Sequence, residues 1–334
     1  MIKLIVTGAG AVLGQGIIKS LRASTLPCEI LALDPNPLSA GLYWADRGGL
    51  IPMASEAHYA ETIETILERE RPDAVLVGTD VELAVFAQRR HDWEKRFGTH
   101  ILVSDERTVE IADDKYLTAQ FLAEHGISHP ASVLPDNEEG LEKLIADVGF
   151  PLIVKPRRGA RAVGVSLVRD RDELMRTLAG REGLVVQQWA GPDEEEYTAG
   201  VLFFDGDVAA SIVMRRDLRD GNTYRAYVDD YPECHDYVQA MARALKPHGP
   251  ANFQFRRDAS GTPRLFEINA RFSGTTPMRM LAGFNEVEMC LRKLLYNEPI
   301  VSPPVRKGVI LRFLQEQFVE NGTIAKMGAE IGAA

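Results

Sequence analysis

Residues 252–271 read NFQFRRDASGTPRLFEINAR, and this stretch decides the fold of the second half of the chain. Two runs of alternating apolar and polar residues, Asn252–Arg257 and Arg264–Asn269, flank Asp258-Ala259-Ser260-Gly261. A short polar segment ending in glycine between two such runs is typical of a β-hairpin. We therefore expect two antiparallel strands here.

One face of this hairpin is predicted to bind a metal ion. Because side chains alternate between the faces of a strand, Glu267 and Asn269 share a face, and the turn places Gln254 opposite Glu267. Phe266 and Ile268 would then point into a core. One carboxylate with two amide oxygens suits Mg²⁺ (or Mn²⁺), which usually takes one or two carboxylates plus substrate phosphates. A solvated polar face is the alternative interpretation.

A second stretch combines a lysine with small residues. Ile153-Val154-Lys155-Pro156 is an apolar strand that ends in a lysine, and the loop after it contains Gly159 and Gly164. Small residues let backbone N–H groups approach phosphates. Upstream, Lys115 starts a helix whose N-cap is Asp113 or Asp114.

The pattern of strands and helices changes near residue 112. Before it, strand and helix patterns alternate, which favours a parallel sheet wrapped by helices. After it, the strands come as hairpins, as in Tyr197–Ile212 around Asp205-Gly206-Asp207. The first part contains predicted strands at Leu4–Val6, Glu29–Leu33, Ala74–Val77 and Ile101–Val103, and a helix at 57–70.

The order of these motifs resembles the ATP-grasp superfamily over about residues 1–300. Its members with the most similar motifs are the carbamoyl-phosphate synthetase large-subunit branch and its amino-acid ligase relatives. The motifs are a lysine at a helix start, strand-Lys-Pro with a small-residue loop, V-V-Q-Q at 185–188, E-E-Y-T at 195–198, and N-F-Q-F…F-E-I-N-A-R.

This resemblance implies an α/β fold with a defined division of the chain. A Rossmann-like pre-ATP-grasp domain with a parallel sheet would occupy residues 1–112. An α+β small subdomain with the phosphate loop would span 113–183, and a large subdomain with the metal hairpin would span 184–320. Residues 321–334, which are rich in Gly and Ala, are expected to be a flexible tail.

The resemblance also implies a role for each matching residue. Lys115 and Lys155 would hold ATP phosphates, and Arg271 would steady the phosphoryl group in transfer, so Lys155 and Arg271 are the expected catalytic residues. The backbone of 185–188 would meet adenine, and Glu196 would bind ribose. The expected ATP-binding set is Lys115, Lys155, Gly159, Ala160, Arg161, Ala162, Gln187, Gln188, Trp189, Glu196 and Arg271, and the expected metal ligands are Gln254, Glu267 and Asn269.

The implied activity is that of an ATP-dependent carboxylate–amine (or ammonia) ligase. ATP would phosphorylate a carboxylate, and an amine would attack the acyl phosphate, releasing ADP and phosphate. Two departures limit the resemblance. The loop reads Gly159-Ala160-Arg161-Ala162 where the family has G-x-G-S, and Gly274 stands where this branch has a second arginine. The second departure disfavours bicarbonate chemistry, and the first keeps open a non-catalytic ATP-binding protein.

The second substrate is not identified by the sequence. The resemblance places it between the N-terminal domain and the hairpin, where Arg225, Arg271, Ser273 and Thr275 are candidate contacts. Arg215, Arg216 and Arg219 form a basic cluster that either binds a carboxylate or is a solvated loop.

The N-terminal glycines offer a rival interpretation. Gly8, Gly10 and Gly14 follow a strand and open a helix, and Asp34 ends the next strand, as in a dinucleotide-binding turn. An NAD(P)-dependent reductase or epimerase is therefore the alternative enzyme. The looser G-x-G-x-x-x-G spacing and the lack of any Tyr-x-x-x-Lys pair weigh against it.

Composition bounds the remaining possibilities. The 334 residues carry 38 Lys and Arg against 48 Asp and Glu, a net charge of −10, which argues against nucleic-acid or anionic-membrane partners. The three cysteines and the histidines show no metal-binding spacing. We expect a cytoplasmic enzyme with small-molecule partners, and a homodimer as an option.

Overall fold

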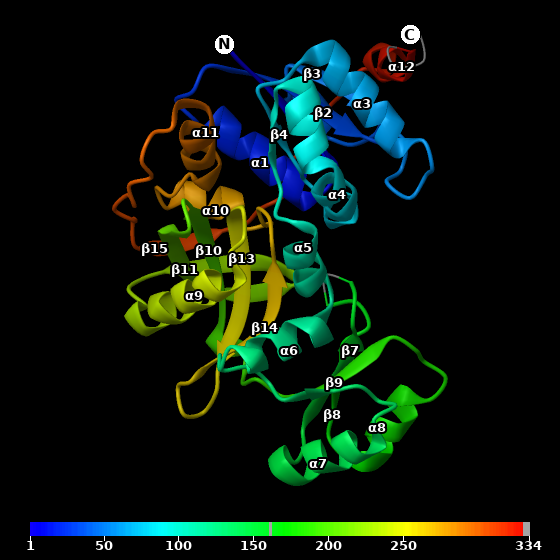
Figure 1. Ribbon diagram of the computed structural model, residues 1–334, viewed down its shortest axis with the longest axis vertical. Helices are drawn as coiled ribbons and strands as arrows, with labels where there is room; N and C mark the ends of the chain where they lie inside the picture. Colours follow the sequence, from blue (N-terminus) through cyan, green and yellow to red (C-terminus); the bar gives the residue numbers. More distant parts are fainter. Residues whose placement is uncertain (160–161, 330–334) are drawn as a thin grey trace.

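The computed structural model describes residues 1–159 and 162–329, which form three sheets with their covering helices (Figure 1). The first sheet is parallel, with the order β3-β2-β1-β4-β5. Chain order reverses between β1 and β4, and ligands of open α/β sheets bind at such points, beside the carboxyl ends of the strands. The strands are β1 (Ile2–Val6), β2 (Cys28–Asp34), β3 (Arg47–Leu50), β4 (Ala74–Leu76) and β5 (His100–Leu102).

Helices cover this sheet because the central strands β1, β2 and β4 carry apolar residues on both faces and bury them. The predicted strand–helix alternation is confirmed, although β3 and the long helix α4 were not anticipated. The helices of this part are α1 (Val12–Arg22), α2 (Gly41–Trp44), α3 (Tyr59–Glu70), α4 (Asp80–Phe97) and α5 (Glu106–Asp113).

The second sheet is small, with the order β6-β9-β7-β8. Leu152, Val154 and Val186 point to one face and form a core with the helices. Alternation therefore places Lys155 on the opposite face. This part contains α6 (Lys115–Glu124), β6 (Ser132–Val133), α7 (Glu138–Val148), β7 (Leu152–Pro156), β8 (Ser166–Val168), α8 (Arg171–Leu178) and β9 (Leu184–Gln188). Asp114 caps α6, which is one of the two N-caps predicted for this helix.

The third sheet is antiparallel, with the order β14-β13-β10-β11-β12-β15. It contains both predicted hairpins, and two strands that the sequence pattern did not reveal, β12 and β15. Its elements are the 3₁₀ turn Asp193–Glu195, β10 (Glu196–Phe204), β11 (Asp207–Arg219), β12 (Asn222–Val228), α9 (Pro232–Leu245), β13 (Gly249–Arg257), β14 (Pro263–Asn269), α10 (Thr276–Leu281), α11 (Glu286–Tyr296) and β15 (Gly308–Leu311).

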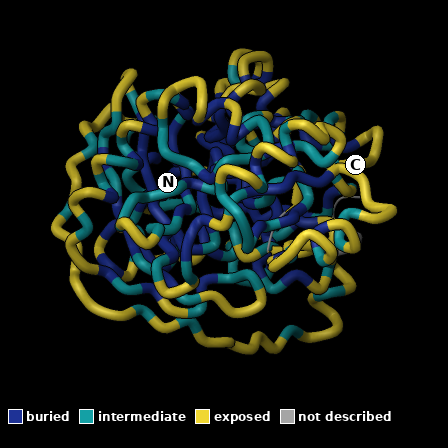
Figure 2. Tube along the Cα trace, turned by 90° about the horizontal axis from the view of Figure 1, so that it is seen from below, coloured by how far each residue is buried: buried dark blue, intermediate teal, exposed yellow. Residues whose placement is uncertain are grey.

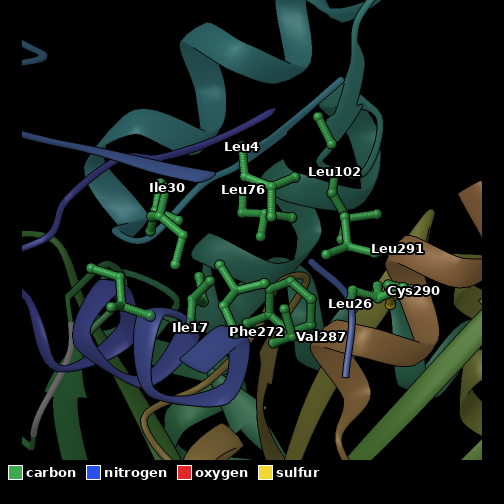
Figure 3. Packing of buried hydrophobic residues seen from close by; sticks show 14 of the residues in the cluster. Leu4, Ile17, Leu26, Ile30, Leu76, Leu102, Phe272, Val287, Cys290 and Leu291 are labelled. Carbon is green, nitrogen blue, oxygen red and sulfur yellow. The ribbon is translucent and has the colours of Figure 1, made fainter. Parts of the chain in front are cut away.

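One hydrophobic core joins the parallel sheet to the part that follows it. Leu4, Leu76 and Leu102 of the parallel sheet pack in the same cluster as Phe272 and Leu291 (Figure 3). The buried chain runs through the middle of the molecule, and exposed loops surround it (Figure 2). This shared core fixes the carboxyl end of β4 against the segment after β14.

The prediction of a flexible tail is wrong for residues 321–329. These form α12 (Asn321–Ala329), which packs on β3 beside the N-terminal domain (Figure 1). Met327 is buried against Gly48, where an added Cβ would lie 2.7 Å from its methyl group. The remaining tail residues, 330–334, lie outside the described residues. None of the described helices has the length and apolarity to cross a membrane.

Candidate functional site

The β13–β14 hairpin has the predicted register, with Gln254 paired to Glu267 and Asn252 to Asn269. A β-bulge between Gln254 and Phe255 makes Leu265, not Phe266, the partner of Phe255. The expectation that Phe266 points into the core beside Ile268 is therefore wrong. The bulge gives that place to Leu265 and leaves Phe266 half-buried beside Lys155.

The three predicted metal ligands lie together around one carboxylate oxygen. Gln254 Nε2 and Asn269 Nδ2 both donate to Glu267 Oε1, at 3.2 Å and 3.0 Å. The amide oxygens accept instead from Arg216 and Arg271, at 2.6 Å and 2.7 Å. The set fits Mg²⁺ by chemistry, and both amides would have to turn to present oxygen. Among the described residues no three His, Cys, Asp or Glu side chains gather, so such an ion would rely on substrate oxygens.

Lys155 crosses from the small sheet to this hairpin. Its Nζ donates to Phe266 O at 3.3 Å and lies 5.5 Å from the Phe266 ring centroid. Burial lowers the pKa of Lys155 to about 7, while Glu267 raises it and Lys115 lowers it. Within the described chain the ammonium has no ion-pair partner. A buried, unpaired cation is costly, and it is a ready partner for a phosphate.

Lys115 lies at the other end of the phosphate loop. Its Nζ donates to Gly159 O at 2.8 Å, so the helix start is tied to the loop. Asp114 supports this arrangement, because it caps the helix and accepts from Arg157 Nη2 at 2.6 Å. In the loop, Gly159 has φ +130° and Ala162 has φ +56°. The predicted loop residues Ala160 and Arg161 lie outside the described residues.

The residues predicted to meet adenine, 185–188, lie in β9. Gln187 is buried, and its Nε2 donates to Ser132 Oγ at 2.9 Å, so its side chain is already engaged. Gln188 Oε1 accepts from Ala131 N at 3.3 Å. Trp189 is 37% exposed at the end of the strand. The backbone of β9 is paired as well, with β6 on one side and β7 on the other, so the end of the strand at Trp189 is the better candidate for adenine.

Glu196 is a buried carboxylate held by two arginines. Arg216 donates to Oε1 at 2.7 Å and Arg256 to Oε2 at 2.6 Å. Both partners were missed as partners of Glu196, and Arg216 had been grouped with a surface cluster. Strand neighbours explain the contact, since Glu196 pairs with Arg256 across β10 and β13. A ribose hydroxyl at Glu196 would have to share an oxygen with one of these arginines.

Arg271 is fixed from the N-terminal domain. Asp80, the first residue of α4, accepts from Arg271 Nε at 2.7 Å and from Nη2 at 3.0 Å. Asn269 Oδ1 also accepts from Nη2. The signal for Asp80 was present in the sequence, because Gly78-Thr79-Asp80 ends the predicted strand 74–77. Its partner Arg271 lies 191 residues further along the chain, so the sequence pattern could not identify this pair.

The residues predicted to contact the second substrate differ in their exposure and in the partners they already have. Ser273 and Thr275 are buried and hydrogen-bond each other at 2.6 Å. Arg225 remains half-exposed, with Asp217 at 3.5 Å. Arg312, which the sequence interpretation missed, follows β15 and donates to Gly274 O. It brings a guanidinium to the position where the branch carries its second arginine, and no described carboxylate pairs with it.

In the N-terminal glycine turn, the hydrogen-bond donors are already bonded to a side chain of the same domain. Gly10 N donates to Asp34 Oδ2 at 2.6 Å, and Ser39 Oγ donates to Oδ1 at 2.7 Å. A Cβ on Gly14 would lie 2.2 Å from Gly8 O, so this glycine allows close helix–strand packing. A dinucleotide pyrophosphate would need the N–H that Asp34 already occupies. The turn therefore has a structural explanation.

Three family models match the chain. A PylC-like N-terminal domain matches residues 4–102, and a RimK-like ATP-grasp domain matches 112–230. An ATP-grasp domain described as belonging to a biosynthetic pathway with the Ter operon matches 184–317. The two ATP-grasp matches together run from 112 to 317.

Two relatives among curated proteins cover most or about half of the chain. The carbamoyl phosphate synthase large chain of Clostridium acetobutylicum is 22% identical over 303 residues, which cover 83% of this chain and 27% of the relative. The D-alanine–D-alanine ligase of Nitrosospira multiformis is 30% identical over 206 residues, covering 55% and 66%. The chain thus spans about a quarter of the synthase chains that it matches.

Solved structures share the fold. An ADP complex of N5-carboxyaminoimidazole ribonucleotide synthetase superposes with a TM-score of 0.72 at 16% identity, covering 91% of this chain and 78% of the other. The L-amino acid ligase of Bacillus licheniformis gives 0.67 at 20% identity, covering 88% and 74%. With the motif order, the family matches and the three-sheet architecture in agreement, the chain belongs to the ATP-grasp superfamily.

Proposed function

We propose that the protein is an ATP-dependent ligase that joins a carboxylate to an amine or to ammonia, through an acyl phosphate, and releases ADP and phosphate. The observation that carries the proposal is the meeting of two sheets at one point. Lys155, from the small sheet, contacts the backbone of β14 beside Glu267, and Glu267 lies between Gln254 and Asn269.

The residues where the two sheets meet supply charge control rather than a nucleophile. Lys155 and Lys115 are cations without described carboxylate partners, and they would bind ATP phosphates. Arg271 lies on the other side of Asn269 and would stabilise the charge of the phosphoryl group during transfer. Asp80 would hold Arg271 in place, so that its guanidinium is already oriented when substrate arrives.

A divalent cation would be held by Glu267 with Asn269 and Gln254. When bound, Mg²⁺ or Mn²⁺ supplies positive charge to the phosphate oxygens. Glu267 is the carboxylate of this set, and its amide neighbours can turn to offer oxygen. The same proposal assigns the ribose hydroxyls to Glu196, the adenine to the end of β9 at Gln188 and Trp189, and the phosphates to the loop that begins at Gly159.

The second substrate is proposed to carry an anionic group near Gly274. Arg312 reaches this region from the edge of the large sheet, where it donates to Gly274 O. The Gly274 position leaves more room than an arginine would, which favours a substrate larger than bicarbonate. A biotin carboxylase domain of similar fold has been solved as a dimer, and a homodimer is the proposed assembly for this chain.

The test is ADP release in the presence of Mg²⁺ and a panel of paired carboxylates and amines. Glu267→Gln is expected to lower the rate by about 100-fold or more, because it removes the carboxylate of the metal face. Asp230→Asn is the matched control. Asp230 is a 79% exposed carboxylate of the same part of the chain, paired with Lys307, and this variant should keep the wild-type rate.

Either of two results would refute the proposal. Wild-type ADP release by Glu267→Gln would show that the hairpin face is not the metal site. ATP binding without ADP release from any pair in the panel would instead favour the non-catalytic ATP-binding alternative. Thermal unfolding of both variants checks that the comparison is between folded proteins.

A further inference from the structure

The large sheet has two edge strands, β14 and β15, and they differ in what lies against them. Lys155 and the helices α5 and α6 contact β14. β15 forms the other edge, and no strand of the described chain pairs with its free side (Figure 1). An open edge can pair with a strand of another chain, and proteins usually protect it with charges, prolines or a covering element. β15 reads Gly-Val-Ile-Leu and contains neither a charge nor a proline.

The free side of β15 presents backbone hydrogen-bonding groups. Arg312, just after the strand, donates from its N–H to Tyr224 O at 3.0 Å, so the backbone of this residue faces β12. In an antiparallel strand the backbone groups of successive residues point alternately to the two sides. The N–H and C=O groups of Val309 and Leu311 therefore point away from β12, where another strand could bind them.

Large apolar side chains gather at this edge. Val309 and Leu311 share one face of β15 and are 55% and 63% exposed. Phe313, Leu314 and Phe318 follow in the next segment and are 80%, 90% and 87% exposed. Single exposed apolar residues are ordinary, whereas a group of them marks an interaction surface. These five residues, all between 309 and 318, are called the edge patch.

The charges that flank the edge patch favour a second copy of the chain as its partner. Arg306 precedes β15 and Glu316 follows it. Both are exposed, and neither makes an ion pair with a described residue. They are equally far from Leu311 in sequence. Antiparallel pairing of β15 with its own copy, about a two-fold axis at Leu311, therefore places Arg306 opposite Glu316 of the second copy.

We propose that the protein forms a two-fold symmetric dimer through β15, in which two large sheets join edge to edge. The side chains of Val309 and Leu311 from both copies form the apolar centre, and two ion pairs between Arg306 and Glu316 flank it. This inference rests on the homodimer proposed above and assigns its surface. It does not depend on the ligase activity, since the edge patch shares no residue with the site around Lys155 and Glu267.

The experiment is sedimentation velocity of the full chain over a dilution series, without nucleotide. The wild type is expected to sediment as a dimer that dissociates on dilution. Leu311→Lys should raise the dissociation constant about 100-fold, because it places two lysines opposite each other at the axis and removes apolar contact. Met175→Lys is the matched control. It changes an exposed apolar residue of α8, in the small-sheet part, and should leave the dissociation constant unchanged.

Charge exchange tests the partner and the register together. Arg306→Glu or Glu316→Arg alone creates two like-charge contacts in each dimer, so each should weaken association about tenfold. The double variant restores two opposite-charge contacts, and its dissociation constant should lie within about twofold of the wild type. Hydrogen exchange of the Val309 amide should be slow in the wild-type dimer and fast in Leu311→Lys, because only strand pairing protects this group.

Four results would overturn the proposal. They are a wild-type protein that is monomeric throughout the series, a dimer that Leu311→Lys leaves intact, a double charge variant as weak as the single ones, and fast exchange of the Val309 amide in the wild-type dimer. Thermal unfolding checks that each variant is folded. No measurement uses ADP release, so a failure here is distinguishable from a failure of the ligase proposal.

Discussion

Two regions of this chain look like nucleotide sites in the sequence, and the structure separates them. In the N-terminal glycine turn, the Gly10 N–H and the Ser39 hydroxyl are both bonded to Asp34. Where the small sheet meets the β13–β14 hairpin, Lys155 is buried and makes no ion pair with any described carboxylate.

The difference shows that a nucleotide site is identified by polar groups without partners in the chain, and not by its number of glycines. A loop whose donors are already bonded to its own chain has nothing to offer a phosphate, because ligand binding would first break those bonds. A buried ammonium without a partner is the reverse case, since a phosphate would relieve its cost. The glycines of the first region allow close packing, and the lysine of the second has no anionic partner until a phosphate binds.

The largest effect is expected from Gly14→Ala, which tests the packing role of the turn. A Cβ there would lie 2.2 Å from Gly8 O and 3.0 Å from Ala9 Cα, and backbone atoms cannot yield as a side chain can. We expect a loss of about 3 kcal/mol in the free energy of unfolding, measured by urea titration. Gly322→Ala is the control, because a Cβ at Gly322 meets nothing within 4 Å. Equal stability of Gly14→Ala and wild type would contradict the close packing.

A smaller effect is expected from Asp34→Ala, which empties the acceptor of the turn. The Gly10 N–H and the Ser39 hydroxyl would lose their partner, at a cost of about 2 kcal/mol in stability. Neither this variant nor wild type should gain thermal stability from NADPH. Asp92→Ala, at an exposed ion pair with Arg96, should change stability by less than about 0.5 kcal/mol. A shift with NADPH would restore the reductase interpretation.

Local pattern was sufficient to predict most single elements. The strand predicted at Arg264–Asn269 is β14 (Pro263–Asn269), and the pairing of Gln254 with Glu267 followed from alternation and the turn. Both depend on neighbours in sequence, which periodicity reports directly. The same holds for the Asp114 cap of α6, one of the two caps predicted for that helix.

Contacts between distant segments could not be predicted in this way. The Asp80–Arg271 ion pair joins residues 191 positions apart, and β15 pairs with β12 across a long connection. The bulge that moves Phe266 out of the core depends on how β13 pairs with β14, and the run LFEIN looks regular without it. Helix α12 has little periodicity of its own and is placed by Met327 on β3.

The smallest expected effect is a pH dependence of ATP affinity that comes from the proton on Lys155. It tests the comparison of the two regions most directly. Burial lowers the pKa of this side chain to about 7 in the free protein, and a bound phosphate would raise it. Above pH 7 the ATP complex therefore holds more protons than the free protein, so affinity for ATP should fall as pH rises, by at most about tenfold per pH unit between about pH 7.5 and 9. Calorimetric titration of Lys155→Met should show weaker binding without this slope. If the affinity of the wild type for ATP did not change with pH, Lys155 would be charged even without ligand. The contrast with the N-terminal glycine turn would then no longer rest on this residue.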